Sequence, residues 1–173
     1  MKTIKKFSAV VALTMMTIFS SCSSSDSGGS GNIPATGSYI NAKIDGASFT
    51  TLISGVSAAS ATRSGTGADT LIIVLGSSLS TNSVNLSLYG ISTTGTYTLN
   101  SSSDSVMAYV DSTSSVAYGT GICEGSTGTL TVTYLDATKI EGTFTFTGKD
   151  GENCAAAAKN VTEGSFRGVF ASN

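Results

Sequence analysis

Alternation of threonine with large apolar residues, near the C-terminal end of the sequence, most restricts what this chain can fold into. Residues 129–135 read TLTVTYL, and residues 139–147 read KIEGTFTFT. A period of two places the apolar side chains on one face of an extended strand and the hydroxyls on the other, whereas a helix would scatter both kinds around its axis. Asp136, Ala137 and Thr138 separate the two segments, so we predict an antiparallel hairpin centred on Ala137, in which residue i lies roughly opposite residue 274 − i.

The rest of the chain divides into similar short segments separated by turn residues. Residues 40–44 alternate, and the Asp45-Gly46 dipeptide that follows them is a strong hairpin signal, with residues 47–54 as the partner strand. Residues 71–75 (LIIVL) are apolar on both faces, which predicts a central strand covered on both sides. Further strands are expected at residues 56–62, 84–88, 95–100, 105–110, 115–120 and 165–170.

The composition points to the same fold class. Gly, Ser and Thr are abundant, 12% of the residues are charged, and the chain has no His and no Trp. Small polar residues mixed with β-branched and aromatic ones favour strands and turns over helices. Roughly ten short strands without a helical period predict an all-β fold, an antiparallel β-sandwich with a β-barrel as the alternative.

The N-terminal segment has the layout of a secretory signal peptide. Lys2, Lys5 and Lys6 form a positive start, residues 7–19 are mostly apolar, and two serines precede Cys22. The apolar run is short for a stable membrane span. We therefore predict an export signal over residues 1–21 rather than a core helix.

The sequence before Cys22, Phe19-Ser20-Ser21, resembles a bacterial lipobox, in which the cysteine thiol receives a diacylglycerol before the signal peptide is removed. Phe19 and Ser21 depart from the commonest pattern, which has Leu and Gly or Ala there. The resemblance implies a mature chain that begins at lipidated Cys22 and is held in a membrane by its acyl chains, each buried methylene contributing about 0.8 kcal/mol. Ser23 in the next position favours the outer membrane, facing either the periplasm or the medium. A conventional signal peptide that leaves Cys22 free is the alternative.

A flexible tether follows the cysteine. Residues 23–32 read SSSDSGGSGN, a composition typical of random-coil linkers, with an end-to-end distance of roughly 16–19 Å. The chain therefore divides into a signal peptide (residues 1–21), a lipidated cysteine with its tether (22–36) and a single all-β domain (37–173).

Two cysteines remain if Cys22 carries lipid. The hairpin register places Cys123 opposite about residue 151, within three positions of Cys154. In an oxidising compartment we expect these two to form a disulfide. Its span of 31 residues would contribute about 3–4 kcal/mol in the loop-entropy model. Two free thiols in loops are the alternative.

Several function classes are excluded or disfavoured. Without His, neither a Ser-His-Asp nor a Cys-His mechanism is available. The three N-terminal lysines leave with the signal peptide, so the mature chain has six basic and eleven acidic side chains, a net charge of −5, and no basic stripe for nucleic acid. We find neither a zinc-ligand pattern nor a phosphate-binding glycine loop, and we expect no metal and no cofactor. Calcium held by loop acids and carbonyls, for instance around Asp150-Gly151-Glu152, is the alternative, although no EF-hand spacing is present.

Carboxylates and tyrosines are the remaining candidates for chemistry. A hydrolase would need only two carboxyl groups at a suitable distance, although solvated loop acids are the more common situation. Stacking on sugars would need exposed aromatic rings, for which three tyrosines are candidates. The acids in or near expected loops are Asp104, Asp111, Glu124, Glu152 and Glu163, and the candidate stacking residues are Tyr39, Tyr89 and Tyr109. Tyr39 and Tyr89 are out of phase with the apolar residues of their strands, whereas Tyr109 shares its face with Met107.

The domain resembles a family of small Bacteroidota lipoproteins described only as a domain of unknown function. The motifs that carry the likeness are Lys43-Ile44-Asp45-Gly46 before Phe49, Gly95-Thr96-Tyr97-Thr98-Leu99, and the block from Gly128 through Gly142-Thr143-Phe144 to Gly164-Ser165-Phe166. The resemblance implies an all-β lipoprotein and no catalytic residues.

These features together favour a non-enzymatic binding or accessory module of the cell envelope, anchored through Cys22, with a protein, glycan or small-molecule partner. A structural or adhesive subunit like the fimbrillin-type lipoproteins is the second hypothesis. A hydrolase that uses two carboxylates is the third.

Overall fold

The computed structural model describes residues 36–171, and its regular structure is almost entirely β. Thirteen strands and one short 3₁₀ helix, η1 (Gly67–Asp69), occur in this range. No helix within these residues is long and apolar enough to cross a membrane. The predicted all-β antiparallel class is confirmed, with more strands than the ten or so expected. The predicted signal peptide, Cys22 and most of the tether lie outside the described residues.

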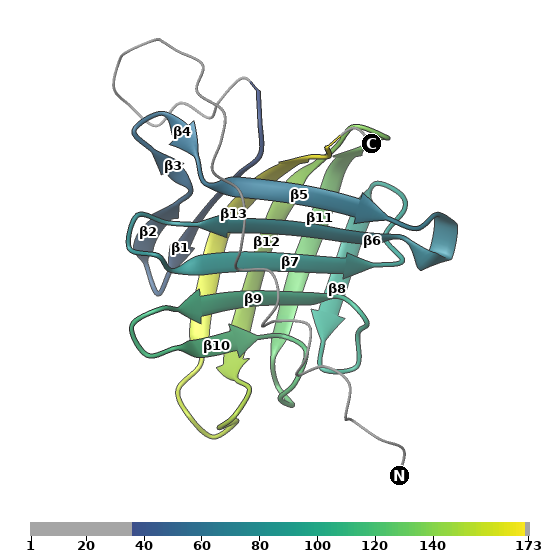
Figure 1. The fold of residues 1–173 in the computed structure, drawn as a ribbon. Coiled ribbons are helices and arrows are strands. Elements are labelled where there is room, and N and C mark those ends of the chain that lie inside the picture. Colours follow the sequence, from purple (N-terminus) through teal and green to yellow (C-terminus); the bar gives the residue numbers. More distant parts are fainter. Residues whose placement is uncertain (1–35, 172–173) are drawn as a thin grey trace. The chain divides into compact units, whose positions relative to one another are not determined.

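Six strands form the layer that lies behind in Figure 1, here called the back layer. Every neighbouring pair in it is antiparallel. In spatial order the strands are β2 (Ala47–Thr50), β1 (Tyr39–Ile44), β13 (Lys159–Val169), β12 (Lys139–Asp150), β11 (Thr127–Leu135) and β8 (Gly95–Asn100).

Five strands form the front layer, which runs across the back layer in Figure 1. A separate two-stranded hairpin, β3 (Leu52–Ile53) with β4 (Val56–Ser57), links β2 to this layer. In spatial order the strands of the front layer are β10 (Val116–Gly119), β9 (Val106–Asp111), β7 (Ser83–Tyr89), β6 (Leu71–Ser77) and β5 (Ala59–Ser64).

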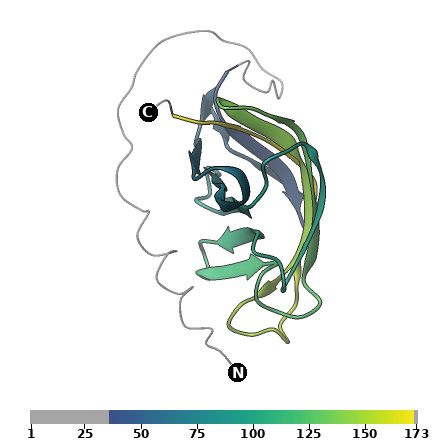
Figure 2. The ribbon, with the colours of Figure 1, turned by 90° about the vertical axis from the view of Figure 1, so that its right-hand side faces the viewer.

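The two layers are parts of one curled sheet. β12 pairs with β11 along most of its length, but its last residues pair with β10, where Tyr118 lies opposite Asp150. At the other edge Ala61 of β5 forms a parallel bridge with Phe170, directly after β13. The sheet therefore curves back toward itself, as Figure 2 shows from the side, and the architecture combines features of a sandwich and a barrel.

One hydrophobic core fills the space between the layers. Both inner faces contribute side chains, and burying each large one contributes about 1.5–3 kcal/mol relative to leaving it in water. The largest fully buried side chains are Phe144, Phe166, Ile40, Ile72, Leu86, Leu88, Leu99, Met107, Leu130, Ile140, Val74 and Val84.

The predicted C-terminal hairpin is confirmed in strand positions and register. Leu130 lies opposite Phe144, as the rule 274 − i requires, and the register shifts only after Val132. The Asp136 carboxylate closes the turn by accepting hydrogen bonds from the backbone N–H groups of Thr138 and Lys139 at 2.7 and 2.9 Å. An aspartate at this position thus replaces backbone partners that the turn leaves unpaired.

The glycines of the Gly142-Thr143-Phe144 (GTF) and Gly164-Ser165-Phe166 (GSF) motifs make room for aromatic rings. In the β12–β13 pair, Gly142 lies opposite Phe166 and Gly164 lies opposite Phe144. A Cβ atom on Gly142 would lie 2.2 Å from the Thr131 carbonyl oxygen and 2.9 Å from the Phe166 ring. On Gly164 it would lie 2.4 Å from the Phe144 oxygen. Each glycine therefore packs against the phenylalanine of the other strand, in the middle of the core.

The first hairpin is confirmed at its turn, but its second strand is shorter than predicted. Asp45 and Gly46 have φ values of +49° and +85°, as a type I′ turn requires. The partner strand stops at Thr50, because the Thr51 hydroxyl accepts the hydrogen bond of the Ile40 N–H at 2.9 Å. The predicted strand at residues 47–54 is therefore divided into β2 and β3, and that at residues 56–62 into β4 and β5.

The prediction that residues 71–75 are covered on both sides is wrong. Ile72 and Val74 are fully buried, whereas the side chains that point the other way are only partly buried. Ile73 lies between Thr62 of β5 and Ser87 of β7. These short polar neighbours flank the isoleucine without covering it, so the outer face of β6 remains partly open to water.

Candidate functional site

A hollow of about 350 Å³ is lined by residues of both layers and is here called the mouth cleft. The back layer contributes the β1–β2 turn and the start of β13, and the front layer contributes the β6–β7 loop and β9. Mouths of curled sheets are frequent ligand sites, because loops from both layers converge there over an apolar interior.

The floor of the mouth cleft is apolar. Ile44 and Phe49 are 9% and 5% exposed, and Tyr109 is 5% exposed. Tyr109 stacks on Tyr118, with 6.3 Å between ring centroids and 27° between ring planes. The floor is thus part of the hydrophobic core and is fixed by it.

An ion pair lies at the edge of the mouth cleft. Lys159 Nζ is 2.8 Å from Asp45 Oδ2, and the other carboxylate oxygen accepts the Asn160 N–H at 2.9 Å. The hydrogen bond from Lys159 holds the pKa of Asp45 below its ordinary 3.8, and the same contact raises the pKa of Lys159. Both groups stay charged at neutral pH, and their charges cancel.

The β6–β7 loop supplies an uncharged polar rim. Ser78 Oγ lies 2.9 Å from Ser80 Oγ, and the Ser78 N–H donates to the Asn82 carbonyl at 2.8 Å. Asn82 Oδ1 accepts hydrogen bonds from the N–H and the hydroxyl of Ser112, both at 3.0 Å. The β9–β10 loop therefore holds this rim in position.

Tyr109 places a hydroxyl beside the rim. Burial raises the pKa of this phenol above its ordinary 10.0, and the negative charge of Asp111 raises it further. The positive charge of Lys159 and a hydrogen bond with the Asn82 side chain lower the pKa and offset part of this rise. The phenol stays protonated at neutral pH, and its own O–H remains a donor.

The other two candidate stacking tyrosines lie away from the mouth cleft. Tyr39 was expected to be exposed, but it is 8% exposed, because Arg167 covers it with its guanidinium carbon 5.5 Å from the ring centroid. Tyr89 is 43% exposed at the end of β7, and its hydroxyl donates to Asp69 at 3.2 Å. The structure thus corrects the expectation for Tyr39 and places Tyr109 in the core, and it does not bring the three rings together into a platform.

The predicted disulfide is present. Cys123 and Cys154 are bonded, with 5.5 Å between their Cα atoms. Cys123 is 1% exposed and its sulfur also contacts the Asp150 carbonyl at 3.2 Å. The bond closes the open end of the β11–β12 hairpin, and neither cysteine lines the mouth cleft.

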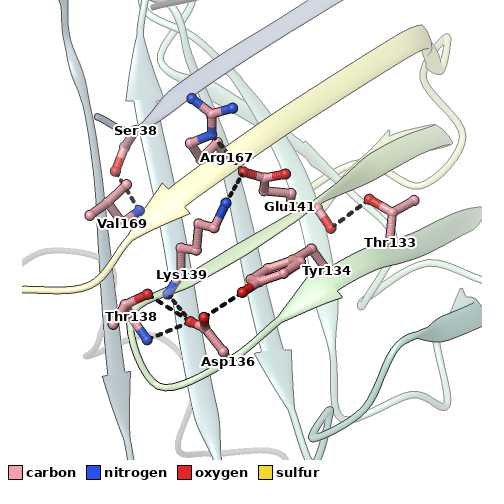
Figure 3. A network of polar contacts seen from close by, with 9 residues as sticks. All are labelled: Ser38, Thr133, Tyr134, Asp136, Thr138, Lys139, Glu141, Arg167 and Val169. Atoms are coloured by element: carbon pink, nitrogen blue, oxygen red, sulfur yellow. Dashed lines mark hydrogen bonds and ion pairs between the residues drawn. The ribbon is translucent and has the colours of Figure 1, made fainter. Parts of the chain in front are cut away.

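A second polar cluster lies on the outer face of the back layer (Figure 3). Glu141 Oε1 accepts from Lys139 Nζ and Arg167 Nε, both at 2.8 Å, and Tyr134 donates to Asp136 at 2.6 Å. Lys139 Nζ also lies 4.3 Å from the centroid of the Tyr134 ring. The cluster fastens β11, β12 and β13 together, and none of its residues lines the mouth cleft.

A second hollow, of about 320 Å³, lies on the same outer face over Gly164. Threonines of β11 and β12 make up half of its lining residues, and its one charged lining residue, Glu163, pairs with Lys43 at 2.7 Å. It lacks the loops that surround the mouth cleft. The mouth cleft is therefore the better candidate site.

Two of the five candidate loop acids make structural contacts. Asp111 accepts the Thr113 N–H at 2.9 Å, and Glu163 pairs with Lys43 at 2.7 Å. Within residues 36–171, no group of three or more Cys, Asp or Glu side chains has the arrangement of a metal site.

Sequence reasoning missed most of the mouth cleft. The sequence marks Asp45 as a turn residue and as part of the Lys43-Ile44-Asp45-Gly46 motif, whereas Ser80, Asn82 and Lys159 belong to no motif. Of the residues that line the mouth cleft, the sequence singles out only Tyr109 as a candidate for ligand contact, through stacking of its ring on a sugar.

Comparison with known proteins identifies the family of this chain. No curated protein and no solved structure matches the chain. One family model, described as a domain of unknown function (DUF6252), matches residues 37–170, a range that contains all thirteen strands. The chain therefore belongs to the DUF6252 family.

Proposed function

We propose that this chain is a non-enzymatic binding module of the cell envelope, anchored by lipid on Cys22 and engaging its ligand at the mouth cleft. The observation that carries the proposal is the cleft itself, a hollow of about 350 Å³ with an apolar floor and with polar side chains held around it by hydrogen bonds. A site that is ordered before the ligand arrives loses less entropy on binding.

The N-terminal sequence supports the location. An export signal, a lipobox-like cysteine and a Ser/Gly-rich tether would place the domain at a membrane of a bacterium of the Bacteroidota type, with the outer membrane favoured by Ser23. Two or three acyl chains hold a protein firmly, whereas one does not.

The pairing of the terminal strands favours this proposal over an adhesive subunit assembled by strand exchange. β1 and β13, the first and last strands of the described residues, pair with each other, and each has a second neighbour in the sheet. Neither is a strand that a partner could replace without breaking two rows of hydrogen bonds.

Anchoring is tested with Cys22→Ala in the full chain. The variant should lose labelling by a fatty-acid analogue and leave the membrane fraction, whereas Cys154→Ser should keep both. Unchanged partitioning of Cys22→Ala would refute the anchor.

Binding is tested by thermal denaturation of the lipidated full chain in detergent, with neutral sugars, sugar phosphates and short peptides as probes. At least one probe should raise the Tm of the wild type, and the same probe should raise the Tm of Tyr109→Phe by a smaller amount. A probe that stabilises both proteins equally would place the binding elsewhere.

A further inference from the structure

We infer that the mouth cleft binds the end of a neutral saccharide, an inference that rests on the proposed binding function and names its ligand class. The ring would lie with its C–H face on Ile44 and Phe49 and with its hydroxyls toward Asp45, Lys159 and the β6–β7 loop.

The charges of the cleft favour an uncharged ligand. Its carboxylate and its ammonium group are Asp45 and Lys159, which pair with each other at 2.8 Å. An anion would be repelled by Asp45, and a cation by Lys159. A neutral ligand leaves the pair intact and avoids the cost of burying an unpaired charge.

The same pair presents an acceptor next to a donor, which suits two neighbouring hydroxyls of a sugar. A carboxylate accepts about four hydrogen bonds and an ammonium group donates three. Asp45 accepts from Lys159 and from the Asn160 N–H, so acceptor capacity remains. One ligand hydroxyl can therefore donate to Asp45 while its neighbour accepts from Lys159.

The opposite rim adds hydroxyl groups that both donate and accept. Ser80 is exposed and contacts Ser78 through its Oγ, which leaves part of its hydrogen-bonding capacity for a ligand. Tyr109 also lines the cleft, and a phenol O–H can donate to a ligand as well as accept from it. An apolar ligand of the same size would remove water from all these groups and give them no partner, which is costly.

Leu79, at the tip of the β6–β7 loop, is consistent with a ligand that extends beyond the cleft. It is 80% exposed, between Ser78 and Ser80. The cleft volume of about 350 Å³ is at the lower end of the range for ligand pockets. The cleft would thus hold the terminal part of a longer chain, and Leu79 would touch the next part.

The experiment uses ¹⁹F NMR of the lipidated full chain in detergent, with 3-fluorotyrosine at all six tyrosines and Tyr109→Phe to assign the Tyr109 signal. The probes are maltose, cellobiose and N,N′-diacetylchitobiose, with glucose 6-phosphate and trialanine for comparison, each at about 10 mM to detect millimolar affinity. At least one neutral disaccharide should shift the Tyr109 signal. Ser80→Ala and Asp45→Asn should each weaken the affinity for that disaccharide by about tenfold, which corresponds to the loss of one hydrogen bond to a ligand. Tyr134→Phe should leave the affinity unchanged.

The outcomes separate this inference from the proposed function. If glucose 6-phosphate or trialanine shifts the Tyr109 signal and the neutral disaccharides do not, the ligand class is wrong and the binding function stands. If a disaccharide shifts Tyr89 and leaves Tyr109 unchanged, the site is wrong. If no probe shifts any tyrosine, both the inference and the binding function at this cleft are overturned.

Discussion

Lys159 Nζ lies 2.8 Å from Asp45 Oδ2, although 114 residues separate the two along the chain. The contact ties the first turn of the domain to the start of its last strand, across the edge of the mouth cleft. Because the side chains are 33% and 40% exposed, water screens the attraction, and the pair adds at most about 1 kcal/mol to stability. Its larger effect is on the charge of the cleft.

Asp45→Asn should therefore change ligand preference more than stability. Asn-Gly forms the type I′ turn at least as well as Asp-Gly, so the free energy of unfolding should stay within about 1 kcal/mol of the wild type. Lys159 loses its partner, and the cleft gains one positive charge. In ¹⁹F titrations the affinity for glucose 6-phosphate should rise relative to that for neutral disaccharides. Glu163→Gln, which breaks an ion pair on another face, should leave this ratio unchanged, and an unchanged ratio in Asp45→Asn would show that Lys159 does not face the ligand.

The disulfide should contribute substantially to stability. It connects residues 31 positions apart, and the loop-entropy model gives about 3–4 kcal/mol for such a span. In urea denaturation of the full chain, the free energy of unfolding of the double variant Cys123→Ser, Cys154→Ser should be lower than that of the wild type by about this amount. Cys22→Ala should leave the free energy of unfolding almost unchanged, because it removes neither sulfur of the bond. A loss below about 1 kcal/mol in the double variant would mean that residual structure already restrains the unfolded chain.

The sequence predicts those parts of the fold that local periodicity determines. Alternation and turn residues are properties of a few neighbouring residues, which is why the register of Leu130 with Phe144 and the turn at Asp45 were correct. The disulfide followed from that register.

Features that depend on distant segments were not predictable in this way. Periodicity tells which face Tyr39 occupies, but not that Arg167 of another strand covers its ring. It marks Ile73 as apolar, but not that its neighbours are too short to bury it. The mouth cleft combines Asp45, Asn82 and Lys159 from three separate turns, so no local pattern signals it.

The paired glycines of β12 and β13 should tolerate no side chain. A methyl group on Gly142 or Gly164 would lie within 2.4 Å of a backbone oxygen, which cannot move without disturbing the sheet. Gly142→Ala and Gly164→Ala should each lower the free energy of unfolding by about 1–3 kcal/mol, the usual cost of overpacking. Gly119→Ala is the matched control, because its Cβ would be no closer than 3.5 Å to any neighbour. If all three variants unfold at the same urea concentration, the sheet accommodates the methyl groups and the explanation of the GTF and GSF motifs is wrong.

Acid should destabilise the domain through three carboxylates. The pKa of Asp136 is lowered mainly by the hydrogen bond from Tyr134 and further by Thr138. That of Glu141 is lowered mainly by Lys139, and that of Asp45 mainly by Lys159. In the unfolded chain these groups return to ordinary values near 3.8 for Asp and 4.5 for Glu. Below those values the unfolded state binds more protons than the folded state, so folding stability decreases as the pH falls.

The free energy of unfolding should therefore be nearly constant from pH 7 to about 5.5 and should decline below about pH 4.5. Asp136→Asn keeps an acceptor oxygen for the turn but removes the titrating group, so its decline should be shallower than that of the wild type. Thr129→Ala, on the same outer face and without a titratable group, should keep the wild-type slope. Urea denaturation at a series of pH values measures all three proteins. If Asp136→Asn declined as steeply as the wild type, the acid sensitivity would come from other carboxylates, and the bond from Tyr134 to Asp136 would contribute little in solution.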